Sequence, residues 1–150
     1  MQYYEDIEVG SVHELGSTSV SREEIVEFAE RYDPQPFHVD EDGAADSIYG
    51  GLIASGWQTA GLVMRLLVEE HLNDHASMGA RGVDELRWHR PVRPGDTLAA
   101  RLEILDKQLS ESRPRLGHVD SQVTAENGDG EEVISWVGLG LYERRSAVEE

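Results

Sequence analysis

The segment from Ser55 to about Leu72 constrains the fold most, because its sequence predicts a long helix that is apolar on more than one side. A helix with so wide an apolar surface must be covered by other elements, so we expect it at the centre of the fold. Its apolar residues recur at helical spacing and extend beyond a single stripe: Trp57, Ala60, Leu62, Val63, Met64, Leu66, Leu67 and Val68.

Four segments after this helix alternate, at least in part, between apolar and polar residues, as strands with one buried face do. Clusters of turn-forming residues separate them. Consecutive strands joined by short turns predict an antiparallel meander, and the expected fold class is therefore α+β, with a sheet around the central helix. The four predicted strands are Val83–His89, Thr97–Leu105, Gly117–Ala125 and Glu132–Tyr142.

Shorter elements are expected before the central helix. Ser21 and Glu24 have the spacing of a capping box, in which each side chain binds the other residue's backbone N–H at a helix start. No repeat or linker divides the chain, so we expect one domain over residues 1–150. The expected elements are an edge strand over 11–20, a helix over 22–31 that two prolines end, and one or two helical turns between 40 and 47.

The charge of the chain excludes two classes of partner. Its 150 residues include 30 acidic and 13 basic side chains, which give a formal net charge of −17, and Lys107 is the only lysine. Such a surface repels nucleic-acid phosphates and anionic membranes, so we expect neither partner. The acidic residues are spread along the chain, which favours adaptation to high salt over an acidic interaction tail, because ions screen self-repulsion.

Three absences in the sequence narrow its chemistry and its location. The chain has no cysteine, which excludes a disulfide scaffold, a thiolate nucleophile and any Cys-ligated metal site. No apolar run approaches the ~20 residues of a membrane span. The first residues lack the basic and apolar regions of a signal peptide, so we expect a cytoplasmic protein.

The residues most suited to chemistry lie just before the central helix. Asp33 and His38 flank a loop that Pro34 and Pro36 stiffen, so that a carboxylate and an imidazole can face one small volume. Such a pair can hold a water molecule, remove a proton from it and deliver a proton nearby. The alternative interpretation is a stiffened turn with a capping Asp and a surface His.

A glycine-containing segment at the start of the central helix is the second candidate. Gly50, Gly51 and Gly56 allow a ligand to approach the backbone closely. Free N–H groups at a helix start can then stabilise negative charge on a carbonyl oxygen. The alternative is that Gly56 only lets a buried helix pack closely.

Together these two segments resemble the hydratase motif of the MaoC-like dehydratases, a family that includes the (R)-specific enoyl-CoA hydratases. The motif residues here are Asp33-x-Gln35-Pro36-x-His38-x-Asp40, then Ala44-Ala45, then the run from Gly50 to Gly56. Residues 87–98 are similar to the family's strand-turn-strand signature, and residues 4–10 and 21–29 also fit. The resemblance therefore covers nearly the whole chain.

This resemblance implies a hotdog fold, in which a bent antiparallel sheet wraps a long central helix. It implies an acyl-thioester hydratase or dehydratase of fatty-acid metabolism that acts on a trans-2-enoyl-CoA without a metal or redox cofactor. Asp33 would be the base toward water, and His38 would orient that water and share the proton transfers. The N–H of Gly56 would hold the thioester carbonyl. The acyl-CoA would lie in a tunnel near the interface of a homodimer or higher homo-oligomer.

Two positions depart from the family pattern, and both are expected to lie beside the acyl group. Gln35 stands where Asn is common, and Ser55 stands where His is common before the helix glycine. With Gly56 and Trp57 they form the predicted substrate-binding set. Because Asp33 and His38 are both present, we expect these two departures to affect which class of substrate is bound and to leave the catalytic pair in place.

Two other functions are compatible with the same scaffold. A hotdog thioesterase would use a carboxylate near the central helix to activate water against the thioester carbonyl. A non-catalytic subunit would bind acyl-CoA or serve in assembly. The placement of Asp33 and His38 on one proline-braced loop favours the hydratase.

Three further features are expected to be structural. His71 and His75 have the spacing of two metal ligands but lack an evident third one, and we interpret them as a solvated helix end. Trp88 and Trp136 lie in alternating segments and are interpreted as core or interface residues. The two arginines of residues 110–115 are interpreted as part of a surface turn, the alternative being a clamp for CoA phosphates.

Overall fold

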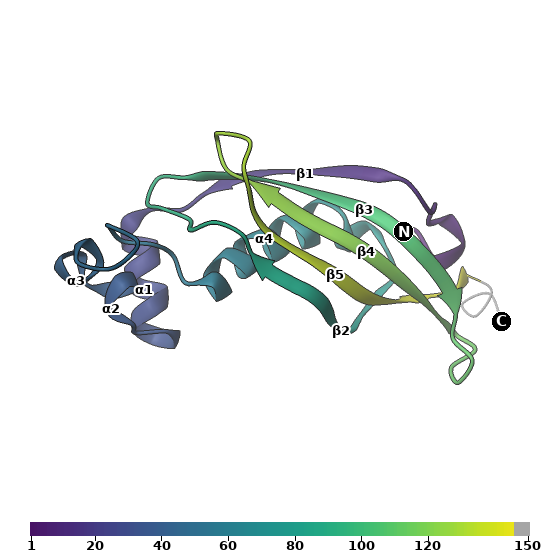
Figure 1. Ribbon diagram of the computed structural model, residues 1–150. Helices are drawn as coiled ribbons and strands as arrows, with labels where there is room; N and C mark the ends of the chain where they lie inside the picture. Colours follow the sequence, from purple (N-terminus) through teal and green to yellow (C-terminus); the bar gives the residue numbers. More distant parts are fainter. Residues whose placement is uncertain (146–150) are drawn as a thin grey trace.

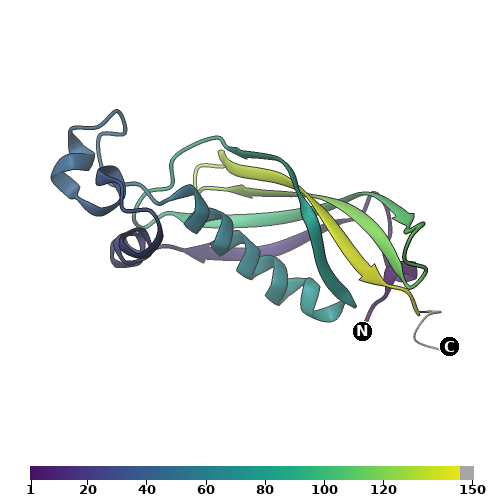
Figure 2. The same ribbon diagram turned by 90° about the horizontal axis from the view of Figure 1, so that it is seen from below.

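In the computed structural model, which describes residues 1–145, a five-stranded antiparallel sheet bends around one long helix, α4 (Gly56–Glu70) (Figure 1). Figure 2 shows α4 lying along one face of the sheet. The central helix expected over about 55–72 is therefore confirmed, with Ser55 at its N-terminal cap position. Within residues 1–145, no helix is long and apolar enough to cross a membrane.

The order of the strands corrects one prediction. The meander is confirmed for β3, β4 and β5, but β2 pairs with β5 at the far edge and not with β3. The connection over residues 89–96 contains two prolines and buries Val92, whose carbonyl accepts from the N–H of Ala54 at 2.8 Å, so it passes the start of α4 and forms no tight turn. The strands are β1 (Val12–Ser19), β2 (Ser77–Trp88), β3 (Thr97–Leu109), β4 (Leu116–Glu126) and β5 (Glu132–Glu143), in the order β1-β3-β4-β5-β2.

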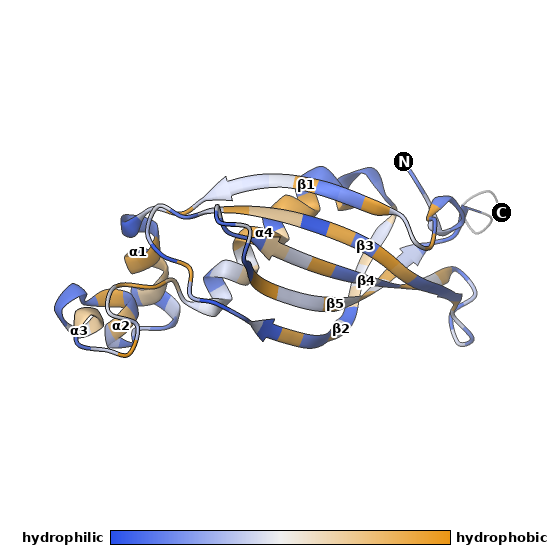
Figure 3. Ribbon diagram, turned by 45° about the horizontal axis from the view of Figure 1, so that its top comes forward, coloured by the Kyte–Doolittle hydropathy of each residue, from blue (hydrophilic) through white to orange (hydrophobic). Residues whose placement is uncertain are grey.

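The core lies between α4 and the side of the sheet that faces it. Along β4, and along β3 as far as Ile104, every second residue is buried, and Figure 3 shows this alternation as hydrophobic and hydrophilic bands along the strands. The α+β class and the predicted edge strand, now β1, are both confirmed. The buried residues of β3 and β4 include Leu98, Ala100, Leu102, Ile104, Val119, Val123 and Ala125.

The described chain does not cover α4 on all sides. Val63, Leu66 and Leu67 are buried, whereas Trp57 and Met64 are 61% and 43% exposed. The expectation that the helix is buried on several sides is thus wrong within one chain. An apolar strip of α4 remains open.

Three helices gather at one end of the sheet, near the start of α4 (Figure 1): α1 (Arg22–Tyr32), α2 (Pro36–Val39) and α3 (Glu41–Ala45). The predicted capping box of α1 is confirmed, because Ser21 Oγ accepts from the N–H of Glu24 at 3.1 Å and Glu24 Oε1 accepts from the N–H of Ser21 at 3.0 Å. The loop expected after α1 instead contains α2. Pro36 suits its first turn, where a backbone N–H has no partner within the helix.

The end of α4 corrects the interpretation of His71 and His75 as solvated. His71 is only 4% exposed, because the short helices η1 (Tyr4–Asp6) and η2 (Leu72–Asp74) lie at this end of the sheet with β1. Its ring stacks on that of His75, with 4.1 Å between centroids, and lies 4.9 Å from that of His13. Among residues 1–145, no group of three or more His, Asp or Glu side chains is arranged to hold a metal ion.

Candidate active site

Helices α1 and α2 bring Asp33 and His38 together. Asp33 directly follows α1, where its N–H donates to the carbonyl of Ala29 at 2.8 Å, and His38 lies within α2. His38 Nε2 lies 3.3 Å from Asp33 Oδ2, and only 4% of His38 is exposed. The two side chains therefore face one small volume, and the alternative of a surface His is wrong.

A backbone carbonyl determines which nitrogen of His38 carries a hydrogen. Nδ1 lies 2.7 Å from the carbonyl oxygen of Ile53. Because a carbonyl oxygen only accepts, Nδ1 must donate, and Nε2 of the neutral ring then has a free lone pair. Nε2 and the Asp33 carboxylate are thus neighbouring acceptors, which can bind the two hydrogens of one water molecule.

Two further side chains donate to the Asp33 carboxylate. Gln35 Nε2 donates to Oδ1 at 2.7 Å, and Ser55 Oγ donates to Oδ2 at 2.7 Å. Partial burial raises the pKa of Asp33, but the hydrogen bonds from Gln35 and Ser55, with the electrostatic attraction of the His38 ring when it is charged, outweigh burial, and the pKa lies below its usual value. The two residues that depart from the family pattern therefore meet at one carboxylate, which they keep ionised.

The first turn of α4 presents backbone donors near this pair. In the described part of the chain, the N–H groups of Gly56 and Trp57 have no acceptor, as is usual for the first N–H groups of a helix. The dipole of a helix of this length adds partial positive charge at the same end. These groups are suited to stabilise a negatively charged carbonyl oxygen.

A cavity of about 470 Å³ joins the acid–histidine pair to the start of α4. Of the predicted site residues, Asp33, Gln35, His38, Gly56 and Trp57 line it. The sixth, Ser55, is fully buried behind the Asp33 carboxylate and does not line the cavity. The remaining wall combines the aromatic rings of Phe37, Tyr49 and Trp88 with aliphatic residues and with the basic side chains of His89 and Arg90.

Comparison with known proteins identifies the family to which this geometry belongs. Residues 8–127 match the sequence model of the MaoC like domain. A 3-hydroxybutyryl-CoA dehydratase of Methylorubrum extorquens is 34% identical over 116 residues, which are 76% of this chain and 71% of that protein. An (R)-specific enoyl-CoA hydratase of Rhodospirillum rubrum is 33% identical over 106 residues, 69% of this chain and 70% of that protein. The chain belongs to the MaoC-like dehydratase family.

A solved structure extends the comparison to the fold. The MaoC-like dehydratase of Rhodospirillum rubrum superposes with a TM-score of 0.89 and 39% sequence identity, covering 97% of this chain and 99% of that one. The hotdog fold that the sequence resemblance implied is therefore confirmed. Membership also confirms the expected enzyme class, since hydratases and dehydratases are lyases.

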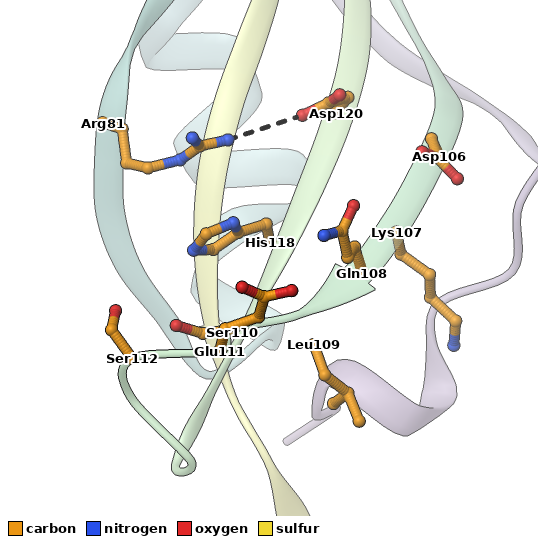
Figure 4. Close-up of a pocket in the computed structure, with 10 residues that line it drawn as sticks. All are labelled: Arg81, Asp106, Lys107, Gln108, Leu109, Ser110, Glu111, Ser112, His118 and Asp120. Carbon is orange, nitrogen blue, oxygen red and sulfur yellow. Dashed lines mark ion pairs between the residues drawn. The ribbon is translucent and has the colours of Figure 1, made fainter.

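This MaoC-like chain has a second cavity, of about 440 Å³, over β2, β3 and β4 (Figure 4). His118 and Asp120 of its lining flank the buried Val119 on β4, so they lie on the sheet face that points away from α4. Arg81 pairs with Asp120 at 4.0 Å, and Lys107 turns away to donate to the carbonyl of Tyr4 at 3.2 Å. We therefore place the candidate active site in the cavity beside α4.

The arginines of residues 110–115 lie far from that site. Arg113 and Arg115 are exposed on the hairpin between β3 and β4, at the opposite end of the molecule from α1–α3 (Figures 1 and 2). Arg115 pairs with Glu143 at 3.6 Å. The expected surface turn is confirmed, and within one chain this hairpin is not a clamp for a ligand of the MaoC-like cavity.

Trp88 and the residues that follow it are the part of the site that sequence reasoning misses. Trp136 is buried, as expected, but Trp88 is 44% exposed and lines the cavity together with residues 89–92. Its interpretation as a core residue is therefore wrong, while its interpretation as an interface residue stays a prediction. The available signal is the connection after Trp88, in which two prolines within residues 89–96 disfavour a tight hairpin to the next strand.

Proposed function

We propose that this MaoC-like enzyme adds water to a trans-2-enoyl-CoA, or removes water from the corresponding 3-hydroxyacyl-CoA, with Asp33 and His38 as the catalytic pair. The observation that carries the proposal is the pairing of an ionised carboxylate with an imidazole whose Nε2 is an acceptor, in the wall of one cavity. General acid–base catalysis requires the acid or base to lie within hydrogen-bonding reach of the proton that it transfers, which both groups can do for one water molecule.

The proposed reaction balances without electron transfer to or from a cofactor. Asp33 and His38 bind the water and remove its proton while its oxygen bonds to C3 of the enoyl group. The π electrons of C2=C3 move toward the thioester oxygen, where the N–H of Gly56 stabilises the enolate charge. The proton that the pair removed then bonds to C2. Dehydration follows the same steps in reverse.

Gln35, Ser55 and Trp57 are assigned supporting roles in substrate binding. Gln35 and Ser55 bind the Asp33 carboxylate and thereby fix the place of the water relative to the acyl group. Trp57 lines the cavity at the start of α4, where the thioester has to lie if Gly56 holds its carbonyl. We expect these residues to select the acyl group through the position of its C2 and C3 atoms.

We also propose that the enzyme is a homodimer. Among residues 1–145, β2 has a partner strand on one side only, and its side chains Met78 and Val83 are exposed, as is Met64 of α4. Exposed apolar residues on a free sheet edge favour pairing with a second copy.

Antiparallel pairing of two β2 strands sets the start of one against the end of the other. Such pairing would bring the hairpin of residues 110–115 of one subunit toward the cavity of its partner, where its arginines could meet CoA phosphates.

Light scattering of the purified chain tests the dimer. The wild type is expected to have twice the mass of one chain, and Val83→Asp is expected to shift it toward one chain. A wild type that stays monomeric at micromolar concentration contradicts the dimer proposal but leaves the reaction proposal in place.

The reaction is tested by the loss of enoyl absorbance from crotonyl-CoA in molar salt. Asp33→Asn and His38→Gln are each expected to lower kcat by about 10²–10⁴-fold, since a positioned acid or base contributes that much. Asp46→Asn and His118→Gln are the matched controls, because both residues lie outside the cavity.

A thiol reagent in the same assay separates the alternatives. Release of free CoA from the thioester would indicate a thioesterase. Binding of crotonyl-CoA with neither hydration nor thiol release would indicate a non-catalytic subunit. Full activity in Asp33→Asn or in His38→Gln would overturn the catalytic assignment. The cytoplasmic location and the role in fatty-acid metabolism stay predictions from the sequence.

A further inference from the structure

The last residue of β2 packs against the first turn of α4. Trp88 Nε1 donates to the carbonyl oxygen of Gly56 at 2.8 Å. A Cβ atom on Gly56 would lie 2.5 Å from Cε2 of the Trp88 ring and 2.6 Å from its Nε1. Only glycine permits so close an approach at this position. Figure 1 shows the end of β2 beside the start of α4.

The hydrogen bond from Trp88 to the Gly56 carbonyl strengthens one of the free N–H donors at the start of α4, that of Trp57. The carbonyl of Gly56 and the N–H of Trp57 belong to the same peptide group. Donation to the carbonyl polarises that group and makes its N–H a stronger donor, because hydrogen bonds in a chain reinforce each other. The bond also fixes the orientation of the first peptide plane of α4 relative to the cavity.

Trp88 holds this position although it is not a core residue. Its ring is only half buried and meets the edge of Trp57, with 5.1 Å between centroids and 85° between planes. The register of β2 shifts between Asp84 and Arg87, where Glu85 has a φ of 55°. Such bulges redirect the end of a strand and are frequent beside active sites.

We infer that Trp88 is a positioning residue, which orients the first peptide plane of α4 and polarises the N–H of Trp57, next to the Gly56 N–H to which the proposed reaction assigns the thioester carbonyl. The inference rests on the proposed hydratase function, because it requires a thioester carbonyl at those groups. Trp88 then contributes more to the enolate-like transition state than to the bound substrate, because the carbonyl oxygen gains charge only as the reaction proceeds.

Trp88→Phe tests this role, since phenylalanine keeps an aromatic ring and removes the N–H. Loss of a complete carbonyl-binding donor lowers kcat by ~10²–10³-fold, and we expect about tenfold for loss of its polarisation. KM for crotonyl-CoA is expected to change less than twofold, and the thermal midpoint to stay near that of the wild type. Trp136→Phe is the control, because Trp136 is a buried tryptophan of β5 outside the cavity.

Absorption of bound 2,4-hexadienoyl-CoA supplies a second readout that stability alone would not change. Polarisation of its carbonyl moves the absorption to longer wavelength, and this shift is expected to be smaller in Trp88→Phe than in the wild type or in Trp136→Phe. Wild-type kcat and an unchanged shift in Trp88→Phe would overturn the inference, as would a raised KM with unchanged kcat. A wild type that hydrates no enoyl-CoA would overturn the proposed function as well, which distinguishes the two failures.

Discussion

Lowering the pH below neutral is expected to destabilise the protein through His71. Burial at the end of α4, and then the neighbouring rings of His75 and His13, lower the pKa of His71 from its usual 6.5 to about 4, while Asp74 acts in the opposite direction. Its Nε2 is buried and has no hydrogen-bond partner in the described chain, so no hydrogen bond at that nitrogen stabilises a positive charge. The folded protein therefore resists protonation of a ring that the unfolded chain protonates readily.

The size of the effect follows from the two pKa values. Above pH 6.5 His71 is neutral in both states and the free energy of unfolding is unaffected. Between pH 6.5 and 4 only the unfolded state binds the proton, so stability falls by up to ~1.4 kcal/mol per pH unit. From pH 7 to pH 5 the expected loss is about 2 kcal/mol, with a limit of about 3 kcal/mol below pH 4.

Urea unfolding of the wild type and of His71→Leu, at constant salt between pH 7.5 and 4.5, measures this loss. The free energies of unfolding of the two proteins will differ at every pH. The quantity to compare is therefore the change in each free energy between two pH values. The difference between these two changes cancels the contribution of the carboxylates, which both proteins share. His71→Leu is expected to lose about 2 kcal/mol less than the wild type between pH 7 and pH 5. His118→Leu, at a half-buried histidine of β4, is the control for removal of a histidine elsewhere in the fold. Equal pH dependence in the wild type and His71→Leu would refute the reasoning.

Three further predictions concern the site, the packing and the charge. Ser55→Ala removes a hydrogen bond that lowers the pKa of Asp33, so the acidic limb of the kcat/KM profile should move to higher pH; an unmoved limb would show that Asp33 is not the titrating base. Gly117→Ala places a Cβ 2.1 Å from the Tyr4 ring and should lower the free energy of unfolding by about 1–3 kcal/mol; a neutral result in urea unfolding would mean that Tyr4 can move aside. The thermal midpoint should rise with KCl into the molar range, because salt screens a net charge of −17; a maximum in dilute buffer would contradict salt adaptation.

The sequence predicted those elements whose signals are local. The capping box of α1 and the long apolar pattern of α4 depend on neighbouring residues, and both helices begin and end within two residues of the expected positions. The pairing of β2 with β5 could not be predicted, because alternation identifies a buried face but contains no information about which strand lies beside it. The burial of His71 depends likewise on β1, whose His13 ring reaches it only in the folded chain.

In the candidate site, too, the features with a local sequence signal could be predicted and the contacts between distant residues could not. The spacing of Asp33 and His38 on one stiffened loop predicts that they face each other, which the structure bears out at 3.3 Å. The contact of Ser55 with Asp33 joins residues 22 positions apart, and that of Trp88 with Gly56 joins residues 32 apart. Neither contact has a periodic signal in the sequence. Both depend on where α4 starts relative to α1 and to the end of β2.

The contacts of Ser55 with Asp33 and of Trp88 with Gly56 affect two different parts of the proposed reaction, the removal of a proton from water and the stabilisation of charge on the thioester oxygen. The bonds that keep Asp33 ionised also make it a weaker base, and the rate of proton removal falls as the pKa of a base falls. If Asp33 is a weak base, the enoyl thioester has to be strongly polarised, because water adds to C3 only when the thioester oxygen can take up the negative charge. The N–H groups at the start of α4 supply that polarisation, and Trp88 strengthens one of them. Raising the basicity of Asp33 through Ser55→Ala should therefore offset part of the kcat lost in Trp88→Phe, which two independent structural defects would not do.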